Sequence, residues 1–520
     1  MTLPFLSLMI FLPLSGVFFL GLVRPKDERN AKSVALWISS INFALGLILW
    51  AQFNRFNSGY QLVEKHEWCN GINIFYYLGI DGISLYFVML TTLLTPLCII
   101  FSWHTIQKRV REYMMVFLLL ETLLLGSFCA LDLVLFYIFF EGTLIPLFLI
   151  IGVWGGEGRT HACFKFFLYT LLGSIFMLLA VAKLYSEFGT TEIPSLVDQK
   201  FSPLLESWIW VAFFIAMAVK IPMWPFHTWL PYAHVEAPTA GSVMLAGVLL
   251  KLGGYGFARI VIPMLPDAST YFAPFVMTLS VIAIFYTSLV ALAQTDMKKL
   301  IAYSSIAHMG FVTLGLFSLT PEGTTGAILS MLSHGLISSA LFFMVGMLYD
   351  RFHALEIKAY GGLHKAFPKL AALFLIFTFS SIAVPGTGSF VAEFLILYGT
   401  FQINTVFTTL ALSGVVLGAA YSLWLYHRLF NGKLVTPLND STDMTSSDNI
   451  SFGHKSIETK THQRTNLDLT FSERFILCYL LVVVLAMGIY PRFFTKHINK
   501  SVRQSVLLHH RISRPNIALY

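Results

Sequence analysis

The sequence predicts an all-α polytopic membrane protein of about 14 transmembrane helices, with two inverted five-helix repeats in which helices 7 and 12 are discontinuous. Three observations predict this fold. The 520 residues are 56% hydrophobic and only 12% charged, whereas soluble domains carry about 25% charged residues. Apolar runs of about 20 residues, the length that crosses a bilayer, recur along the whole chain. Two runs are interrupted by proline or glycine, and these interruptions lie five spans apart.

The apolar runs define the predicted spans in chain order. They lie near residues 4–23, 33–52, 82–103, 112–130, 131–153, 163–186, 207–232, 238–263, 270–293, 298–318, 324–348, 369–402, 407–430 and 473–493. The first run lacks a basic leading segment and a clear cleavage site, so we interpret it as a spanning helix and not as a signal peptide. Pro222 and Pro225 interrupt span 7, and residues 385–388 (PGTG) interrupt span 12.

Basic side chains gather in the loops that follow odd-numbered spans. They are Arg24, Lys26, Arg29, Lys32, Lys108, Arg109, Arg111, Lys298, Lys299, Arg351, Lys358, Lys365, Lys369, Arg428 and Lys433. Because loops on the inner side of a membrane carry an excess of Lys and Arg, we expect these loops to face inward and both termini outward. The basic C-terminal segment runs against this rule, and we interpret it as a tail.

The spacing of the two interrupted helices predicts the domain organisation. Five crossings reverse the direction of the chain, so a five-helix repeat inserts its second copy upside down. We therefore expect helices 1–3 in residues 1–111, a first repeat of helices 4–8 in 112–263, and an inverted repeat of helices 9–13 in 270–430. A polar inner loop follows in 431–472, then helix 14 and a tail in 473–520. Residues 439–469 are rich in Ser, Thr, Asp and Asn, which predicts a flexible segment.

Four charged side chains lie near the centres of apolar spans: Glu141, Lys220, Lys251 and Glu393. A charge at the centre of a membrane helix costs about 2.5–3.5 kcal/mol on insertion scales, and such residues commonly mark ion or proton pathways. The sequence therefore predicts that this protein moves protons or ions across a membrane.

Lys220 directly precedes the proline interruption of span 7, where freed backbone groups need water or polar partners. Glu141 is predicted to lie at a similar depth in span 5. A carboxylate beside a buried lysine favours the charged ammonium, and its movement or protonation would release the lysine proton. The alternatives are a proline kink with a lysine that reaches the interface and a static buried ion pair.

Lys251, His308, His334 and Glu393 each lie near the midpoint of their span, which predicts a lateral polar row. Histidine suits proton relay because its ordinary pKa is near 6.5. Taken singly, either histidine also fits a hydrogen-bonded packing role, and the interruption before Glu393 also fits a simple hinge. His227 is a weaker relay candidate, and Glu121 fits a half-channel group or a structural residue equally.

Several other classes of function are disfavoured. The five cysteines lie far apart with no CxxC pair, so neither a zinc site nor an iron–sulfur cluster is indicated. No glycine-rich nucleotide fingerprint follows a strand. The formal net charge of +7 is explained by basic loops on one side of the membrane, so no nucleic-acid partner is expected.

Several strings in order along the chain carry a family resemblance. They are LGIDGIS at 78–84, FFEGTLIP at 139–146, WLPYAHVEAPTAGSV at 229–243, IAYSSIAHM at 301–309 and LSHG at 332–335. With Glu141, Lys220, Lys251 and Glu393, the chain resembles the antiporter-like membrane subunits of respiratory complex I (NADH:ubiquinone oxidoreductase) over nearly all its spans. Glu393 in place of a lysine resembles the chain 4 branch and not chains 2 and 5. The 439–469 insertion departs from the compact family pattern.

The resemblance implies a proton path. Glu141 and Lys220 would form a coupling pair, Lys251 would be the central carrier, and His308 and His334 would relay protons to Glu393. NADH-to-ubiquinone electron transfer in other subunits would drive the transfer. The resemblance also implies no cofactor in this chain, with NADH, FMN, iron–sulfur clusters and ubiquinone in partner subunits, and antiporter-like chains 2 and 5 and lipids as neighbours.

Two other functions compete with this one. A subunit of a multisubunit sodium/proton antiporter would share the interrupted helices and the lysines, whereas a purely structural subunit would not need Lys251. The high phenylalanine count of 48 favours an AT-rich coding genome and hence a mitochondrial inner membrane, with a bacterial plasma membrane as the alternative.

Overall fold

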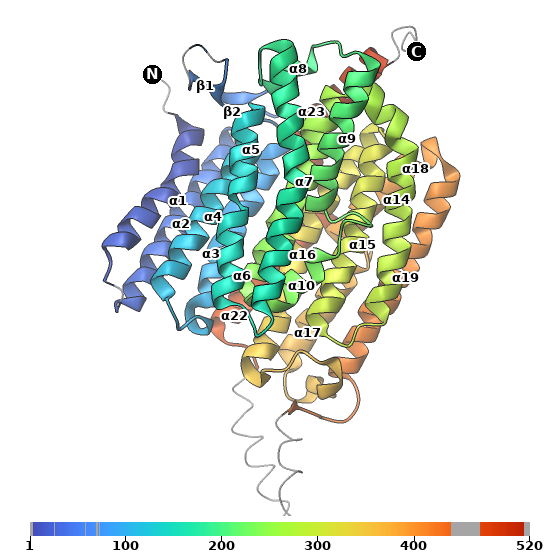
Figure 1. The fold of residues 1–520 in the computed structure, drawn as a ribbon. Coiled ribbons are helices and arrows are strands. Elements are labelled where there is room, and N and C mark those ends of the chain that lie inside the picture. Colours follow the sequence, from blue (N-terminus) through green and yellow to red (C-terminus); the bar gives the residue numbers. More distant parts are fainter. Residues whose placement is uncertain are drawn as a thin grey trace, which may run out of the picture.

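The computed structural model describes residues 4–24, 26–57, 59–68, 71, 73–437 and 468–513. In this part of the chain, 13 helical segments are long and apolar enough to cross a membrane. The shorter helices α17 (Pro368–Ser381) and α18 (Gly388–Ile403) follow one another from one end of the bundle to the other and complete one more crossing (Figure 1). The expected number of about 14 spans is therefore confirmed.

The spans form one bundle of nearly parallel helices, with the start of α1 and the end of α23 at the same end of the bundle (Figure 1). The N-terminal part comprises α1 (Phe5–Leu22), α2 (Glu28–Gln52), α3 (Ser84–Thr105) and α4 (Val110–Cys129). It is followed by α5 (Leu133–Gly142), α6 (Leu144–Trp154), α7 (Arg159–Phe188), the short α8 (Ile193–Val197), α9 (Pro203–Lys220), α10 (Trp229–Glu236) and α11 (Thr239–Met244).

The same crossing as α11 continues through η1 (Leu245–Leu249), α12 (Leu250–Gly256), η2 (Phe257–Val261) and α13 (Ile262–Met264). Then come α14 (Pro266–Leu292), α15 (Met297–Phe317), α16 (Pro321–Phe352), two short 3₁₀ turns at Ile357–Ala359 and Leu363–Lys365, α17, α18 and α19 (Thr405–Phe430). The chain closes with α22 (Phe471–Ile489) and α23 (Arg492–Ser513).

Spans 7 and 12 are discontinuous, as predicted. α9 ends at Lys220, and α10 starts only at Trp229. The prolines between them cannot donate backbone hydrogen bonds, and the Trp229 indole instead donates to the carbonyl of Val219 at 3.0 Å. Span 5 is also divided, into α5 and α6. Pro146 in α6 lacks the N–H that would bond to Gly142 four residues earlier.

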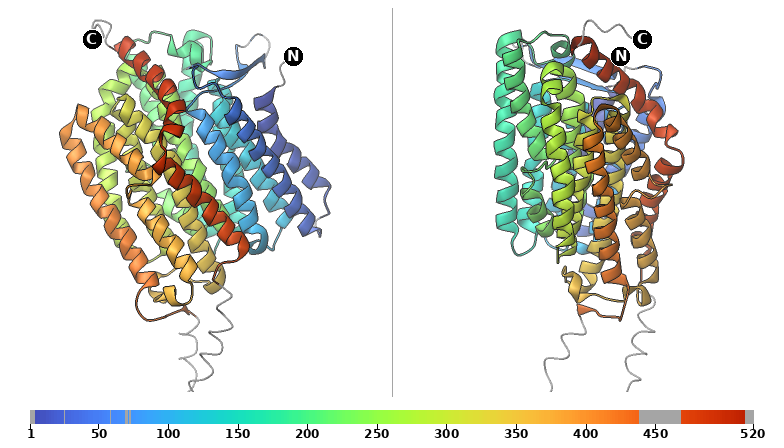
Figure 2. Two further views of the ribbon diagram at one scale, coloured as in Figure 1. Left: turned by 180° about the vertical axis from the view of Figure 1, so that it is seen from behind. Right: turned by 90° about the vertical axis from the view of Figure 1, so that its right-hand side faces the viewer.

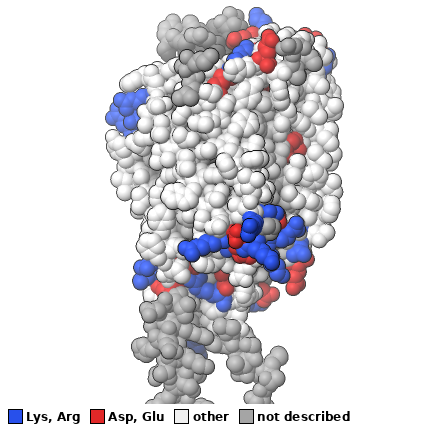
Figure 3. Space-filling view, turned by 90° about the vertical axis from the view of Figure 1, so that its left-hand side faces the viewer, with Lys and Arg blue, Asp and Glu red and all other residues white. Residues whose placement is uncertain are grey.

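On the face of the bundle shown in Figure 3, charged side chains are concentrated toward the two ends, and the belt between them is almost uncharged. The inner end predicted from the basic loops is the end opposite the two termini, where α15 and α17 start. The predicted flexible segment lies almost wholly outside the described residues, which resume at Asp468.

The C-terminal segment beyond span 14, interpreted from the sequence only as a tail, forms a helix. Within α23, Ile498, Val502 and Val506 recur at every fourth position and are buried against the bundle. A Cβ on Gly82 would lie 2.0 Å from the carbonyl oxygen of His497, so α23 packs directly on backbone. Figure 2 shows α23 crossing the outside of the bundle obliquely.

The outer loop before α3 contains a hairpin of β1 (Gln61–Glu67) and β2 (Phe75–Ile80).

Candidate functional site

Lys251 lies on α12 at the centre of the bundle and is fully buried. The π-helical segment η1 directly precedes α12, and π-helical turns often mark functional sites. The ammonium Nζ donates to the carbonyl of Ala246 and lies 2.8 Å from Nδ1 of His334 on α16. In the described part of the chain, no carboxylate lies within 4.0 Å of this ammonium. Among the described residues, the side chain that Lys251 contacts by hydrogen bonding is the imidazole of His334, which can itself carry a proton.

The row continues from His334 to Glu393. The rings of His334 and His308 have centroids 5.5 Å apart, and Nδ1 of His308 lies 3.4 Å from Oε1 of Glu393. These residues come from α16, α15 and α18, so three different helices supply one line of titratable groups. The lateral row predicted from the shared depth of Lys251, His334, His308 and Glu393 is present in the structure.

Lys220, at the end of α9, contacts the junction between α5 and α6. Its Nζ lies 3.3 Å from Oγ1 of Thr143 and 3.5 Å from the carbonyl oxygen of Phe140. It also lies 4.3 Å from the centre of the Phe140 ring. The contacts of Lys220 with Thr143 and Phe140 depend on the division of span 5, because that division places Thr143 beside the lysine.

Glu141 is the neighbour of Phe140, but it does not form an ion pair with Lys220 within 4.0 Å among the described residues. Its Oε1 is buried and has no hydrogen-bond partner there. The predicted pair is therefore close in the fold but separated in this state. The static ion pair considered as an alternative is not what the structure contains.

The two lysine sites are joined by backbone packing. A Cβ on Gly253, two residues after Lys251, would lie 2.6 Å from the backbone nitrogen of Ile221 and 2.8 Å from the carbonyl oxygen of Met217. Only glycine permits so close an approach of two backbones. The position of α12 is thus tied to the end of α9 that carries Lys220.

Sequence reasoning missed four side chains at this site. Thr143 contacts Lys220, and Ser381 has its hydroxyl 3.5 Å from Nε2 of His308. Tyr421 and Ser381 line two adjoining small cavities, one beside His308 and one closer to the start of α15 and α17. His234 is buried, stacks on Phe342 with centroids 4.6 Å apart, and has both ring nitrogens without a hydrogen-bond partner among the described residues. Thr143 and His234 stood in strings that sequence analysis singled out, whereas Ser381 and Tyr421 did not.

The two secondary candidates lie outside the row. Glu121 on α4 accepts a hydrogen bond from the Asn42 amide on α2 at 2.8 Å. His227, between α9 and α10, has its ring near Tyr286 and Tyr303, with centroids 6.2 and 6.4 Å away. Neither contacts Lys251, His334, His308 or Glu393 in the hydrogen bonds and ion pairs of the described residues.

Comparison with known proteins identifies the family. A family model described as NADH:quinone oxidoreductase/Mrp antiporter, TM, matches residues 130–418. A second, NADH-ubiquinone oxidoreductase chain 4, amino terminus, matches residues 7–129. The chain belongs to the NADH-ubiquinone oxidoreductase chain 4 family. The resemblance found in the sequence is thereby confirmed, and the protein is a multi-pass membrane subunit of NADH:quinone oxidoreductase, with other complex I subunits as its partners.

Members of the chain 4 family from bacteria and algae match over nearly their whole length. NADH-quinone oxidoreductase subunit M of Rhodobacter capsulatus is 49% identical over 522 residues, with 97% of each chain covered. NADH-ubiquinone oxidoreductase chain 4 of Chondrus crispus is 48% identical over 490 residues, with 94% of this chain and 95% of the relative covered.

Solved structures agree with this family assignment. A chain of respiratory complex I from Thermus thermophilus with bound NADH matches with a TM-score of 0.84 and 30% identity, covering 97% of this chain and 99% of that chain. A chain of the Mrp complex from Dietzia sp. has a TM-score of 0.81 at 19% identity, covering 96% of this chain and 52% of that chain. The latter shows a shared fold alone.

Proposed function

We propose that protons cross the membrane through this chain along Glu141, Lys220, Lys251, His334, His308 and Glu393. The observation that carries the proposal is the contact series from Lys251 Nζ to His334 Nδ1 at 2.8 Å and from His308 Nδ1 to Glu393 Oε1 at 3.4 Å. Every member of the series has an atom that can both accept and release a proton. A scaffold that only fills space would not require buried charges at these positions.

The contacts suggest how a proton moves between neighbours. A hydrogen bond between an ammonium and a neutral imidazole nitrogen already aligns the donor, the proton and the acceptor. Lys251 can therefore pass its proton to His334 without a large movement. The rings of His334 and His308 are centred 5.5 Å apart, and a single water can bridge such polar groups. His308 then exchanges a proton with Glu393 directly.

Lys220 and Glu141 would supply the coupling step. In this state the Lys220 ammonium is held by a hydroxyl, a carbonyl and an aromatic face, and Glu141 Oε1 is unpaired. Closing the gap between them would strengthen the hold on the proton of Lys220, and opening it would weaken that hold. The pair thus acts as a charge-dependent switch next to the row.

The driving reaction would take place in other subunits. We place NADH, FMN, the iron–sulfur clusters and ubiquinone on partner chains of the complex and none of them on this chain. The antiporter-like chains 2 and 5 are the proposed direct neighbours, together with membrane lipids. We place the chain in the mitochondrial inner membrane, which chain 4 relatives from Chondrus crispus, Marchantia polymorpha and Arabidopsis thaliana support, while subunit M relatives support the bacterial plasma membrane as the alternative.

The test compares proton pumping with NADH-to-quinone electron transfer in the assembled, reconstituted complex that carries Lys251→Ala. Both rates are expected to fall together, while Lys183→Ala, at an exposed position, leaves both unchanged. A normal electron-transfer rate with a normal proton-to-electron ratio in Lys251→Ala would show that the row is structural. Pumping that requires sodium would favour the sodium/proton antiporter instead.

A further inference from the structure

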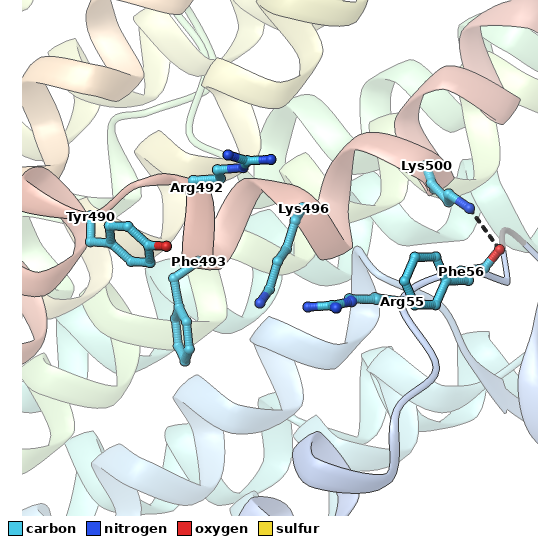
Figure 4. Close-up of a pocket in the computed structure, with 7 residues that line it drawn as sticks. All are labelled: Arg55, Phe56, Tyr490, Arg492, Phe493, Lys496 and Lys500. Carbon is cyan, nitrogen blue, oxygen red and sulfur yellow. Dashed lines mark hydrogen bonds between the residues drawn. The ribbon is translucent and has the colours of Figure 1, made fainter.

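A cavity that plays no part in the proposed proton path lies between the end of α2 and the start of α23. Its volume is about 390 Å³, within the range of small-molecule sites. Four cationic side chains line it: Arg55, Arg492, Lys496 and Lys500. Figure 4 shows that Arg55 and Lys496 extend from different elements with their charged ends turned toward one another. Two like charges that converge in this way repel unless an anion lies between them.

No carboxylate compensates these four cations. In the described part of the chain, none of them lies within 4.0 Å of an Asp or Glu side chain. Lys500 Nζ donates to the carbonyl of Phe56 at 2.8 Å. The remaining contacts are with aromatic faces, and Arg55 lies 4.9 Å from the centre of the Phe56 ring. The cavity therefore offers an anion several donors that this chain leaves unused.

The same cavity has apolar walls next to the charges. Phe56, Tyr490 and Phe493 complete its lining, and Phe56 is 70% exposed. Ile489, the last residue of the final apolar span α22, is 73% exposed beside Tyr490. Arginine and lysine next to exposed aromatic and aliphatic groups, just where a span ends, are typical of the membrane interface. A free inorganic anion would make no use of this apolar surface.

We propose that this cavity binds the phosphodiester headgroup of an anionic phospholipid from the outer leaflet. The phosphate would lie between Arg55 and Lys496, with Arg492 and Lys500 on either side along α23. The acyl chains would follow the exposed surface around Phe56 and Ile489. The bound lipid would join the loop after α2 to α23. This also explains why α23 carries basic residues at the end of the bundle where the positive-inside rule disfavours them.

The test uses the assembled complex in nanodiscs of phosphatidylcholine that contain a small fraction of photoreactive phosphatidylglycerol. Lipid adducts are expected on peptides that contain residues 55–56 and 490–500. Arg55→Gln with Lys496→Gln should reduce these adducts by about fivefold for each charge removed, whereas Lys496→Arg should retain them. The matched control removes two exposed lysines from the same end of the bundle, Lys183→Gln with Lys200→Gln, and should have no effect.

Several results would overturn the proposal. Adducts that persist in the double variant, or that fall equally in the control, would show that the cations do not hold the lipid. Adducts abolished by excess inorganic phosphate would identify a site for small anions. A zero-length carbodiimide crosslink from Lys496 to an acidic residue of a neighbouring subunit, without lipid adducts, would identify a protein contact. If the double variant does not assemble, Lys496→Gln alone is expected to reduce adducts about fivefold, and unchanged adducts would reject the site.

Discussion

The ammonium nitrogen of Lys251 lies 2.8 Å from Nδ1 of His334, although the two residues are 83 positions apart in the chain. They come from opposite halves of the predicted inverted repeat, so the contact joins the two halves at the centre of the bundle. In the proposed path, the hydrogen bond at this junction makes His334 the next proton acceptor after Lys251.

Replacing His334 by glutamine should interrupt the row while retaining a polar side chain of similar length. Coupled electron transfer and proton pumping are expected to fall by about a hundredfold, because loss of a positioned acid–base group costs at least that much in proton transfer. The measurement is pumping by the reconstituted complex, with exposed His104→Gln as the control. Full activity in His334→Gln would remove this residue from the path.

Thr143→Val should weaken proton transfer at Lys220 without removing the lysine. The change deletes a hydroxyl 3.3 Å from the ammonium, and a hydrogen bond to a charged group contributes about 1.5 kcal/mol or more. We expect pumping to fall about tenfold. Thr170→Val is the control, because the hydrogen bonds of its hydroxyl within the described part of the chain go to carbonyls of its own helix. Equal effects of the two valines would argue against a role for Thr143 beyond helix packing.

Gly253→Ala should destabilise the junction between α12 and α9. The added methyl group meets backbone atoms of Ile221 and Met217, which cannot move aside as a flexible side chain could, and overpacking of this kind costs about 1–3 kcal/mol. The thermal midpoint and the yield of assembled complex should both drop. Gly21→Ala adds a methyl group in open space and serves as the control; a similar drop there would point to a general sensitivity of the helices.

The ion pair between Arg351 on α16 and Glu473 on α22 should stabilise the inner end of the bundle. The two terminal guanidinium nitrogens of Arg351 each donate to one carboxylate oxygen of Glu473 at 2.8 Å, and the side chains are mostly buried. Arg351→Met leaves the buried Glu473 carboxylate without its cationic partner and should lower the free energy of unfolding by about 3 kcal/mol. Adding Glu473→Gln removes the stranded charge and should recover part of the loss in thermal stability. No recovery in the double variant would mean that Arg351 acts mainly through packing.

Docking of α23 should weaken at acidic pH because of His497. Burial lowers the pKa of this imidazole, and nearby Lys496 and Arg55 lower it further, although the Phe493 carbonyl opposes them. Docking is therefore fully stable above the ordinary histidine pKa of about 6.5 and is lost as pH falls through the lower docked value. The protection of α23 amides from hydrogen exchange, relative to the intrinsic rate at each pH, should fall between neutral and acidic pH. His497→Phe should abolish this dependence, and if it persists in that variant another group is responsible.

Much of the fold could be predicted because membrane spans are encoded locally. Apolar runs of sufficient length marked the crossings, and Pro222, Pro225 and the PGTG segment marked the interruptions. The row from Lys251 to Glu393 could also be predicted, because residues at the midpoint of neighbouring spans share a depth. The depth of a residue in the membrane does not, however, tell on which side of its helix the side chain lies. The partner of Lys220 depends on the division of span 5 at Thr143, which the position of Pro146 determines.

The elements that were missed are amphipathic and not apolar. α23 buries Ile498 and Val502 but carries Arg492, Lys496 and Lys500 on its other side, so its average composition resembles that of a polar tail. The β1–β2 hairpin is short and largely exposed on β1, and its pairing register is not marked by a tight Asn-Gly or Asp-Gly turn. In both cases, contacts with distant parts of the chain determine the structure.

The π-helical segments on either side of Lys251 make the proton row sensitive to chain length as well as to side-chain chemistry. Each residue of a helix turns the following one by about 100°. Deleting or inserting one residue within Leu245–Leu249 would not change any titratable side chain. It would nevertheless rotate Lys251 relative to the preceding part of the crossing and so turn it away from His334. In this crossing, the number of residues therefore constrains the proposed proton row as strongly as the chemistry of its side chains.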